Sequence, residues 1–444
     1  MKNEAEEGNE PVISFTTFSF GCRVNEAERQ ALESKLIEAG FTPDRQKPQI
    51  CLINTCAVTV KAEREAKQLI YRLRRDFPQA KIVVTGCAAT YWEKNGFYKD
   101  LPVDMLIGNT QKDYLVGLLK KRQNASSSNN LINLSGYFSY SGKLPESGRI
   151  LVKIQDGCQR FCTYCIVPYL RGQPKSEKIE NIVERIRAVG TKFISPVKEI
   201  ILTAINTEAF GYDTGETFVD LLKRIIDKTT IPRISCGSIN PWSIDDDFLR
   251  FYKQNKSLKR FVNFFHVPLQ SGSNKILSLM KRGYTAEDFM DKIVTLHKIN
   301  PFALIATDII VGFLDETDKD FEDTYRFLEK SPIAKFHIFR FSKRDNTAAY
   351  FMTKRLNEPP STVKNERAKQ LKELGDRKYN QFLIKLINYN STALFINKSE
   401  GNYQEALLDN QIPAWIKTEN NLNGQIKNVC VTEFKNGKLF GKID

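Results

Sequence analysis

The chain has little histidine: three residues among 444. So few imidazole groups leave little for conventional histidine catalysis or for a histidine-rich zinc site. No apolar run reaches the roughly 20 residues that a membrane-spanning helix needs. The acidic, polar residues 1–11 also lack the apolar core of a secretory signal. These absences predict a soluble, cytoplasmic protein with no membrane partner.

Cysteine is the next clue. The nine cysteines are an odd number scattered over a long chain, which does not suit a disulfide framework. In the cytoplasm such thiols stay reduced and available to metals. Lys and Arg total 66 against 52 Asp and Glu, a net charge of +14. This excess favours a polyanionic partner, most simply nucleic acid.

Three cysteines form the most informative motif of the chain. Cys158, Cys162 and Cys165 follow the spacing C-x3-C-x2-C. A zinc ribbon would need a fourth ligand, usually from a second C-x2-C pair, and none lies near. Three thiols can instead hold a 4Fe-4S cluster and leave one iron open, as a catalytic site requires. The alternative is a broken zinc site or a chance arrangement.

The first part of the chain, residues 13–120, predicts an open parallel α/β domain. Strand-like runs alternate with amphipathic helical stretches, an order typical of parallel sheets. The strand-like runs are residues 14–20, 50–54, 80–85 and 105–107, and the helical stretches are 26–39 and 61–77. Residues 121–148, rich in Ser and Asn, read as a linker.

Residues 149–387 predict a partial parallel (β/α)6 barrel. Helical stretches separate six strand-like runs: 150–154, 199–203, 233–238, 261–269, 304–312 and 335–341. In such barrels the chemistry lies at the carboxyl ends of the strands. The cysteine motif falls directly after the first run, where that site is expected. Residues 388–444 predict a small antiparallel all-β barrel, because short β-like runs alternate with Gly and Asn turns.

A second cysteine set is spread over the N-terminal segment. Cys22, Cys56 and Cys87 each end a strand-like run. Because the carboxyl ends of parallel strands line one edge of a sheet, these thiols are expected to meet there and hold a second cluster with one open iron. The alternative is that they are buried core cysteines. That core interpretation is preferred for the remaining three, Cys51, Cys236 and Cys430.

The two cysteine sets together resemble the radical S-adenosylmethionine (SAM) methylthiotransferases. The likeness spans nearly the whole chain, from a three-cysteine N-terminal domain through a radical SAM barrel to a C-terminal TRAM β-barrel. The matching stretches are residues 21–25 (Gly-Cys-Arg-Val-Asn), 54–59 (Asn-Thr-Cys-Ala-Val-Thr), 85–87, 153–158, 266–273 and 307–313. One departure stands out: Leu314 and Asp315 replace the usual Pro-Gly of the family.

The resemblance implies two 4Fe-4S clusters and two SAM molecules per reaction. The cluster on Cys158, Cys162 and Cys165 would cleave SAM to a 5′-deoxyadenosyl radical. The cluster on Cys22, Cys56 and Cys87 would carry the sulfur that is methylated and transferred. An electron donor such as a flavodoxin or ferredoxin is implied, and the sulfur donor stays open.

The resemblance also suggests further contacts with SAM or substrate. Polar residues that follow barrel strands are candidates, namely Asn206, Glu208, Gln270, Ser271 and Ser273, with Tyr164 supporting adenine through its backbone. The alternative for each is ordinary loop structure, such as helix capping.

Three substrate classes occur in the family. The Gly-Cys-Arg-Val-Asn and Asn-Thr-Cys-Ala-Val-Thr runs, with residues 337–344, look most like the branch that acts on N6-threonylcarbamoyladenosine beside the tRNA anticodon. The alternatives are isopentenyladenosine in tRNA and an aspartate of a ribosomal protein. An alternative of another class is a non-catalytic iron–sulfur protein that binds RNA.

Overall fold

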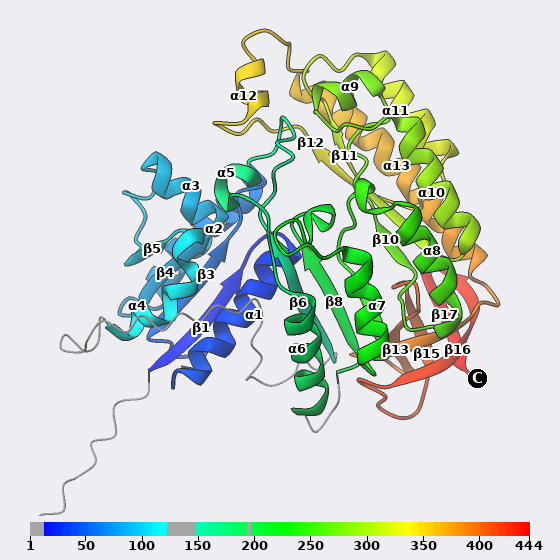
Figure 1. Ribbon diagram of the computed structural model, residues 1–444, viewed down its shortest axis with the longest axis horizontal. Helices are drawn as coiled ribbons and strands as arrows, with labels where there is room; N and C mark the ends of the chain where they lie inside the picture. The colour runs from blue at the N-terminus through cyan, green and yellow to red at the C-terminus, as the bar shows by residue number, and fades with distance from the viewer. Residues whose placement is uncertain (1–12, 122–147, 193–196) are drawn as a thin grey trace, which may run out of the picture. The chain divides into compact units, whose positions relative to one another are not determined.

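The computed structural model describes residues 13–121, 148–192 and 197–444 (Figure 1). Residues 1–11 and nearly all of the predicted linker, 121–148, lie outside this part of the chain. Two compact units are present, Met1–Lys143 and Leu144–Asp444. None of the described helices has the length and apolar character that a membrane crossing needs.

The N-terminal unit is built on a five-stranded parallel sheet in the order β2-β1-β3-β4-β5. The central strand β3 is buried along its whole length, which its apolar run required. On helix α2, Ala66, Leu69, Ile70 and Leu73 recur at helical spacing and are buried. The elements are β1 (Ser14–Ser19), α1 (Arg23–Glu38), β2 (Thr42–Pro43), β3 (Ile50–Thr55), α2 (Val60–Asp76), β4 (Lys81–Gly86), α3 (Cys87–Asn95), β5 (Met105–Ile107) and α4 (Leu115–Lys121).

The second unit contains the predicted parallel barrel, with a strand at each of the six expected places. They are β6 (Arg149–Asp156), β8 (Glu199–Ala204), β9 (Arg233–Cys236), β10 (Phe264–His266), β11 (Leu304–Val311) and β12 (Lys335–Arg340). Isolated parallel bridges, Ile234 to Phe261 and Ser238 to His266, join β9 to β10 and make the sheet continuous. A short strand, β7 (Lys175–Ser176), adds an antiparallel edge to β6. The predicted α/β fold class is confirmed.

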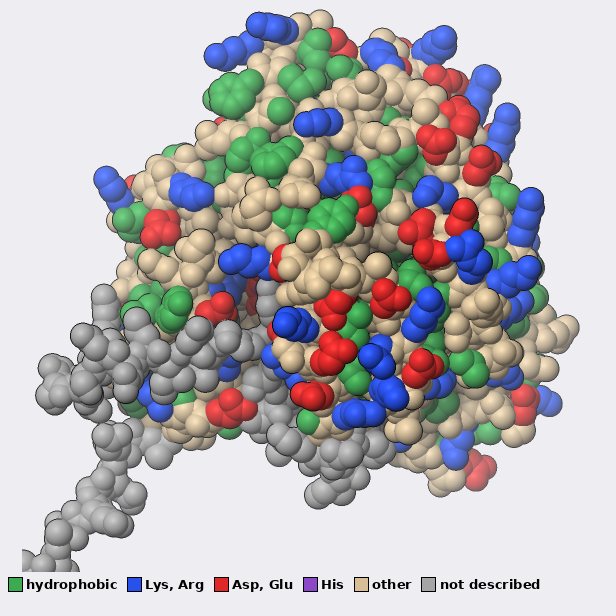
Figure 2. All heavy atoms as spheres, viewed as in Figure 1, with side chains coloured by type: hydrophobic (Ala, Val, Ile, Leu, Met, Phe, Trp, Pro, Cys, Tyr) green, Lys and Arg blue, Asp and Glu red, His purple; other side chains and the backbone are tan. Residues whose placement is uncertain are grey.

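Helices cover the outside of this barrel and carry mixed charge. Ion pairs lie on their exposed faces, for example Arg224 with Glu180 at 3.6 Å and Arg326 with Glu322 at 2.6 Å. Figure 2 shows basic and acidic side chains interspersed over the visible face rather than gathered into one basic band. The longer helices are α6 (Ile179–Lys192), α7 (Phe218–Lys228), α8 (Asp246–Asn255), α10 (Ala286–Ile299), α11 (Asp318–Lys330) and α13 (Ser361–Lys385).

The C-terminal segment forms a closed five-stranded barrel in the order β13-β14-β15-β17-β16. Strands β15 and β17 run parallel, so the prediction of a purely antiparallel barrel is wrong at this pair. The parallel pair arises because β16 returns on the far side of β17 and closes the barrel. The strands are β13 (Asn390–Glu400), β14 (Tyr403–Leu407), β15 (Pro413–Lys417), β16 (Ile426–Lys435) and β17 (Lys438–Ile443).

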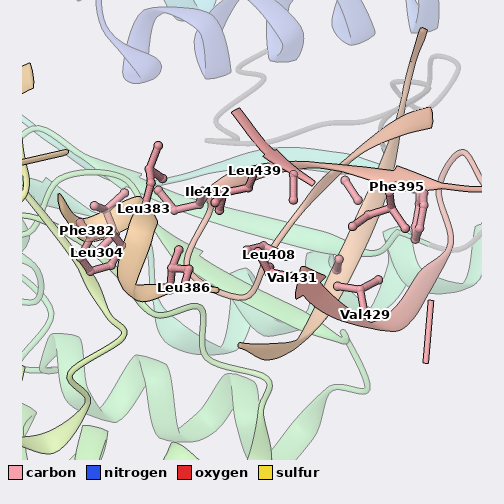
Figure 3. Packing of buried hydrophobic residues seen from close by; sticks show 14 of the residues in the cluster. Leu304, Phe382, Leu383, Leu386, Phe395, Leu408, Ile412, Val429, Val431 and Leu439 are labelled. Atoms are coloured by element: carbon pink, nitrogen blue, oxygen red, sulfur yellow. The ribbon is translucent and has the colours of Figure 1, made fainter. Parts of the chain in front are cut away.

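This small barrel shares a hydrophobic core with the parallel barrel (Figure 3). Leu304 of β11 and three residues at the end of α13 pack with Phe395, Leu408 and Val431. Both barrels belong to the same compact unit, Leu144–Asp444. This shared core supports the parallel barrel, which carries the cysteine motif.

A buried polar seam lies beside that core. Glu199 is fully buried and bonds Arg149 and Arg233, each at 3.1 Å, while Arg233 also donates to the carbonyl oxygen of Leu408. Burial opposes ionisation of Glu199, yet the two arginines lower its pKa. Arg149, Glu199 and Arg233 are the first residues of β6, β8 and β9. The small barrel thus closes the amino ends of the strands, opposite the cysteine motif.

Candidate functional site

The cysteine motif occupies the loop that follows β6, as predicted. Gly157 has a φ of +73°, and a Cβ there would lie 2.1 Å from the carbonyl oxygen of Gln173, so only glycine fits. The amide of Cys158 donates to Gly172 at 3.1 Å, and that of Cys165 donates to Cys162 at 2.9 Å. Glycine and backbone hydrogen bonds therefore fix the fold of this loop.

Burial makes two thiols of this loop, those of Cys158 and Cys165, costly to ionise. It raises the pKa of Cys165 to about 12, with Cys162 adding to the shift, and it raises the pKa of Cys158. A cation that binds all three thiolates would reverse this cost, and its binding would release protons. The donor set therefore suits an iron–sulfur cluster, with three thiolates and no fourth protein ligand from the motif.

Arg282 reaches this loop from the segment after α9 (Asn274–Leu279), and the sequence reasoning missed it. Its Nη1 lies 3.3 Å from the Sγ of Cys162 and 3.2 Å from the hydroxyl of Tyr164. Its Nε donates to Tyr284 at 2.9 Å. A buried guanidinium with these partners holds positive charge against the thiolates. Arg282 is 120 positions from Cys162 in sequence, so no local pattern could reveal it.

Asn206 and Glu208 lie on the other side of the motif. The Nδ2 of Asn206 is 3.7 Å from the Sγ of Cys158, and its Oδ1 accepts from the amide of Glu208 at 3.2 Å. Glu208 pairs with Arg160, whose Nε is 2.8 Å from Oε2. Arg160 also stacks on Trp242, with its Cζ 4.0 Å from the ring centroid. Arg160 is thus paired with a carboxylate beside the cysteines rather than held as a lone positive charge.

The predicted serines serve the fold. Ser273 caps helix α9 and donates to Asp320 at 2.8 Å, so the alternative interpretation of helix capping describes it. Ser271 is fully buried, with its hydroxyl 3.2 Å from that of Thr324 on α11. Gln270 differs, since its backbone has a φ of +79°. A non-glycine residue held in this region is costly and is often found at functional sites. The unusual backbone favours Gln270 as a contact, and the contacts of Ser271 and Ser273 stay predictions.

At the departure from the family pattern, Leu314 is buried and Asp315 holds an unusual backbone conformation. Asp315 adopts a φ of +53°, the left-handed conformation that the usual glycine takes easily. Its amide donates to the carbonyl of Asn357 at 2.8 Å, and its Oδ1 accepts from the amide of Asn357 at 2.7 Å. Aspartate tolerates this conformation better than most residues, and the two bonds hold it there.

The second cysteine set lies at adjacent strand ends, as expected. Cys22 follows β1, Cys56 follows β3 and Cys87 begins helix α3 after β4, and these strands are neighbours in the sheet. A Cβ on Gly21 would lie 2.4 Å from the Sγ of Cys56, so the first two loops touch. Cys22 is exposed at the N-cap of α1, whereas Cys56 and Cys87 are buried.

Buried amides join these loops, and sequence reasoning missed them. The Nδ2 of Asn25 donates to the carbonyl oxygens of Phe20 and Thr55, both at 2.9 Å. Asn54 donates back to the carbonyl of Asn25 at 2.7 Å. Lys112 supports Asn54 at 3.2 Å and pairs with the buried Glu28 at 2.6 Å. The loops that carry Cys22 and Cys56 are thereby bonded to each other.

The other cysteines were predicted to lie in cores. Cys51 and Cys236 are buried in β3 and β9, and burial raises their pKa values to about 11 and about 12. The prediction is confirmed for these two. It is wrong for Cys430, which is half-buried on β16. The strand alternates, and Val429 and Val431 on either side point into the small barrel instead.

Comparison with known proteins finds a family model that matches each of the two segments carrying a cysteine set. The radical SAM superfamily model matches residues 152–328, and the model described as uncharacterized protein family UPF0004 matches residues 14–108. The chain is 33% identical to threonylcarbamoyladenosine tRNA methylthiotransferase MtaB of Aquifex aeolicus, over 87% of this chain and 93% of that protein. It is 30% identical to the protein of the same name from Bacillus subtilis, over 94% and 93%.

A relative with a different name is also similar. The tRNA-2-methylthio-N(6)-dimethylallyladenosine synthase of Desulfotalea psychrophila is 33% identical, over 78% of this chain and 80% of that protein. Among solved structures, the radical SAM methyltransferase TsrM of Kitasatospora setae aligns with a TM-score of 0.52 at 12% identity, covering 74% of this chain and 73% of that one. At that identity the likeness shows the fold alone.

Proposed function

Because the chain belongs to the radical SAM methylthiotransferases, we propose that it places a methylthio group on C2 of N6-threonylcarbamoyladenosine at position 37 of tRNA. The chain is an enzyme, a transferase, and the cofactors of its family are SAM and iron–sulfur clusters. The observation that carries the proposal is the similarity to the Aquifex aeolicus protein of that activity along 93% of its length.

Within this proposal, Cys158, Cys162 and Cys165 hold the cluster that works with SAM. When bound, that cluster supplies the electron that cleaves SAM to a 5′-deoxyadenosyl radical. Arg282 stabilises the thiolate of Cys162 through its Nη1 at 3.3 Å. Asn206 donates toward Cys158 and orients the Glu208–Arg160 pair at the rim. Tyr164 follows the carboxyl end of β6 and Gln270 follows that of β10, and both are proposed contacts for SAM.

Cys22, Cys56 and Cys87 are proposed to hold the second cluster, which carries the transferred sulfur. The fit rests on three features of these thiols. They end adjacent strands, Cys22 and Cys87 stand at helix N-termini, and the amide of Val58 donates to the Sγ of Cys56 at 3.4 Å. Helix N-termini and amide donors both favour the thiolate that binds iron.

The proposed partners follow from this reaction. The substrate is tRNA in the cytoplasm, and the net charge of +14 favours binding of its phosphates. On the face shown in Figure 2 the basic side chains are intermixed with acidic ones, so binding there would draw on separate contacts. A flavodoxin or ferredoxin is the proposed electron donor.

The dimethylallyl-adenosine reaction is the second candidate, because the Desulfotalea psychrophila synthase is equally identical at 33%. Mass spectrometry of tRNA nucleosides from cells with and without the gene separates the two. We expect 2-methylthio-N6-threonylcarbamoyladenosine to disappear on deletion, while its unthiolated precursor accumulates.

Loss of the dimethylallyl nucleoside instead would move the enzyme to the second candidate. If neither nucleoside changed, tRNA would no longer be the favoured substrate, and the aspartate of a ribosomal protein would be tested next. A catalytically inactive iron–sulfur protein would leave all three substrates unchanged.

A further inference from the structure

A polar cluster lies across three neighbouring strands of the barrel. His266 of β10, Asp308 of β11 and His337 of β12 bring one ligand-type atom each within 4.8 Å of the others. The register explains the meeting, because Asp308 pairs directly with His337 and His266 pairs with Ala306, two residues before Asp308. Two of the three histidines in the chain therefore share one carboxylate.

The cluster faces the inside of the barrel. Along β11, Ile305, Thr307 and Ile309 are fully buried, whereas Asp308 and Ile310 on the alternate face are partly exposed, as expected for the face that lines the barrel opening. On the same face of β11 as Asp308, Leu304 lies at the base of the barrel, in the core shared with the small barrel. Ile310 lies near the top, packed against the same hydrophobic cluster as Tyr164 of the cysteine motif. Asp308 therefore lies just below the level of the cysteine loop.

Hydrogen bonds define the state of each group. Burial opposes ionisation of Asp308, but bonds from His266 and His337 lower its pKa to about 2, so it is a carboxylate at neutral pH. The Nε2 of His266 donates to it at 2.8 Å, and the Nδ1 of His266 then accepts from the hydroxyl of Ser238 at 2.6 Å. Both ring nitrogens of His266 are thus occupied.

His337 is different. Its Nδ1 lies 3.3 Å from the Oδ1 of Asp308, which uses one nitrogen and orients the ring. Within the part of the chain that the structure describes, no hydrogen bond occupies its Nε2. The side chain of His337 is 41% exposed, against 12% for His266 and 21% for Asp308. One oriented polar atom is therefore presented to whatever enters the barrel.

We propose that His337 is the residue that selects the threonylcarbamoyl substituent, by donating a hydrogen bond from Nε2 to its carboxylate. This inference rests on the proposed function and specifies the part of the substrate that the barrel recognises, the carboxylate of the threonylcarbamoyl group. With both nitrogens protonated, His337 bonds Asp308 on one side and the substrate carboxylate on the other. Asp308 and His266 act as positioning residues that hold its ring.

The chemistry of the rival substrate supports this choice. A dimethylallyl group has no polar atom. When it binds, it would displace water from His337 and Asp308 without forming a hydrogen bond in its place. Leaving a polar group unpaired on substrate binding is costly, and a site built to bond a polar group discriminates strongly against an analogue that lacks it. The cluster thus favours the threonylcarbamoyl form over the dimethylallyl form.

The test compares three anticodon stem-loops of one sequence, with threonylcarbamoyladenosine, dimethylallyladenosine or plain adenosine at position 37. The full chain with both clusters is used as wild type, His337→Leu and His337→Gln. The matched control is His297→Leu, which removes the third histidine, on helix α10. Measured quantities are kcat/KM for methylthiolation, Kd for each RNA, Kd for SAM, and 5′-deoxyadenosine formed without RNA.

We expect His337→Leu to lower kcat/KM for the threonylcarbamoyl RNA about 100-fold, within the range for loss of a hydrogen bond to a charged group. Its Kd for the plain RNA, its Kd for SAM and its RNA-free SAM cleavage should stay at wild-type values. His337→Gln keeps an N–H donor and should recover part of the loss. His297→Leu should match the wild type throughout.

Three results would overturn the inference. One is wild-type discrimination between the two modified RNAs by His337→Leu. Another is an equal loss of SAM binding or of plain RNA binding, which would make His337 a cofactor or structural residue. The last is a divalent metal ion, in addition to iron, bound by wild type but not by His337→Leu. Failure of the wild type itself on the threonylcarbamoyl RNA would count against the proposed function instead.

Discussion

The two cysteine triplets reach similar donor sets by opposite routes. In the barrel, Cys158, Cys162 and Cys165 share one loop of eight residues, and the spacing alone identifies them. In the N-terminal unit, Cys22, Cys56 and Cys87 come from the ends of three strands, and they share one edge of the sheet only because β1, β3 and β4 are neighbours. The first triplet can be recognised from the local sequence alone, whereas recognising the second requires the correct strand order of the sheet.

The surroundings of the two triplets also differ. The barrel thiol Cys162 receives a hydrogen bond from the charged Arg282 at 3.3 Å. Neutral donors reach thiols of both triplets: the amide of Val58 donates to Cys56, and the side chains of Asn109 and Asn206 donate to Cys87 and Cys158, both at 3.7 Å. A fixed positive charge stabilises thiolates more strongly than a neutral amide does.

The largest expected effect comes from Cys158→Ala. Loss of one of three thiolates should remove the barrel cluster, so iron content should fall by about four atoms per chain. SAM cleavage should become undetectable, because no other described group supplies its electron. Iron analysis together with 5′-deoxyadenosine measurement checks this. SAM cleavage at the wild-type rate would show that the barrel triplet is not the SAM site.

Cys56→Ala should separate the two tasks. The barrel cluster is expected to remain, so 5′-deoxyadenosine should still form. The methylthio nucleoside should be absent, because the sulfur-carrying cluster has lost a ligand. Mass spectrometry of the reaction products checks this. Methylthio product at the wild-type level would contradict the assignment of the N-terminal triplet.

Arg282→Ala tests the charged contact at Cys162. Removing an outer partner of a metal ligand typically costs 10- to 100-fold in metal affinity or activity, and we expect a loss of about that size in SAM cleavage. The reduction potential of the barrel cluster should also fall, because a positive charge is lost beside it. Arg282→Lys is the matched control, since it keeps the charge but not the planar fork that also bonds Tyr284. An unchanged potential in the alanine variant would remove the electrostatic role.

Asn109→Ala is the corresponding change at the N-terminal triplet and should have the smallest effect. A neutral hydrogen bond contributes about 1 kcal/mol, so we expect a decrease of roughly fivefold in methylthio product with normal SAM cleavage. Product yield in the two variants is the measurement. A larger loss from Asn109→Ala than from Arg282→Ala would reverse the contrast between the sites.

Much of the fold was predictable because its cause is local. Each barrel strand is a short apolar run between helical stretches, and all six appear at their expected places. The run at 261–269 is an exception in length, since only Phe264–His266 is a regular strand. Pro268 has no backbone N–H, and Leu269 donates to the side chain of Thr307 instead of to the backbone of β11.

The unpredicted parts depend on distant pairing. Arg282 meets Cys162, and Asp308 meets His337, only once the strands have their final register. His266 lies in the family-like stretch 266–273, but its bond to Asp308 had no local signal. The shared core of the two barrels was missed for a similar reason, because Leu304 and Phe395 have the pattern of any buried strand residue.

One measurement tests most directly the claim that the barrel triplet serves SAM cleavage and the N-terminal triplet serves methylthio transfer. Wild type, Cys158→Ala and Cys56→Ala are incubated with SAM, a reductant and the same threonylcarbamoyladenosine stem-loop, and both products are quantified in each sample. The account predicts both 5′-deoxyadenosine and methylthio nucleoside from wild type, 5′-deoxyadenosine alone from Cys56→Ala, and neither from Cys158→Ala. Methylthio nucleoside from either variant at the wild-type yield would contradict it.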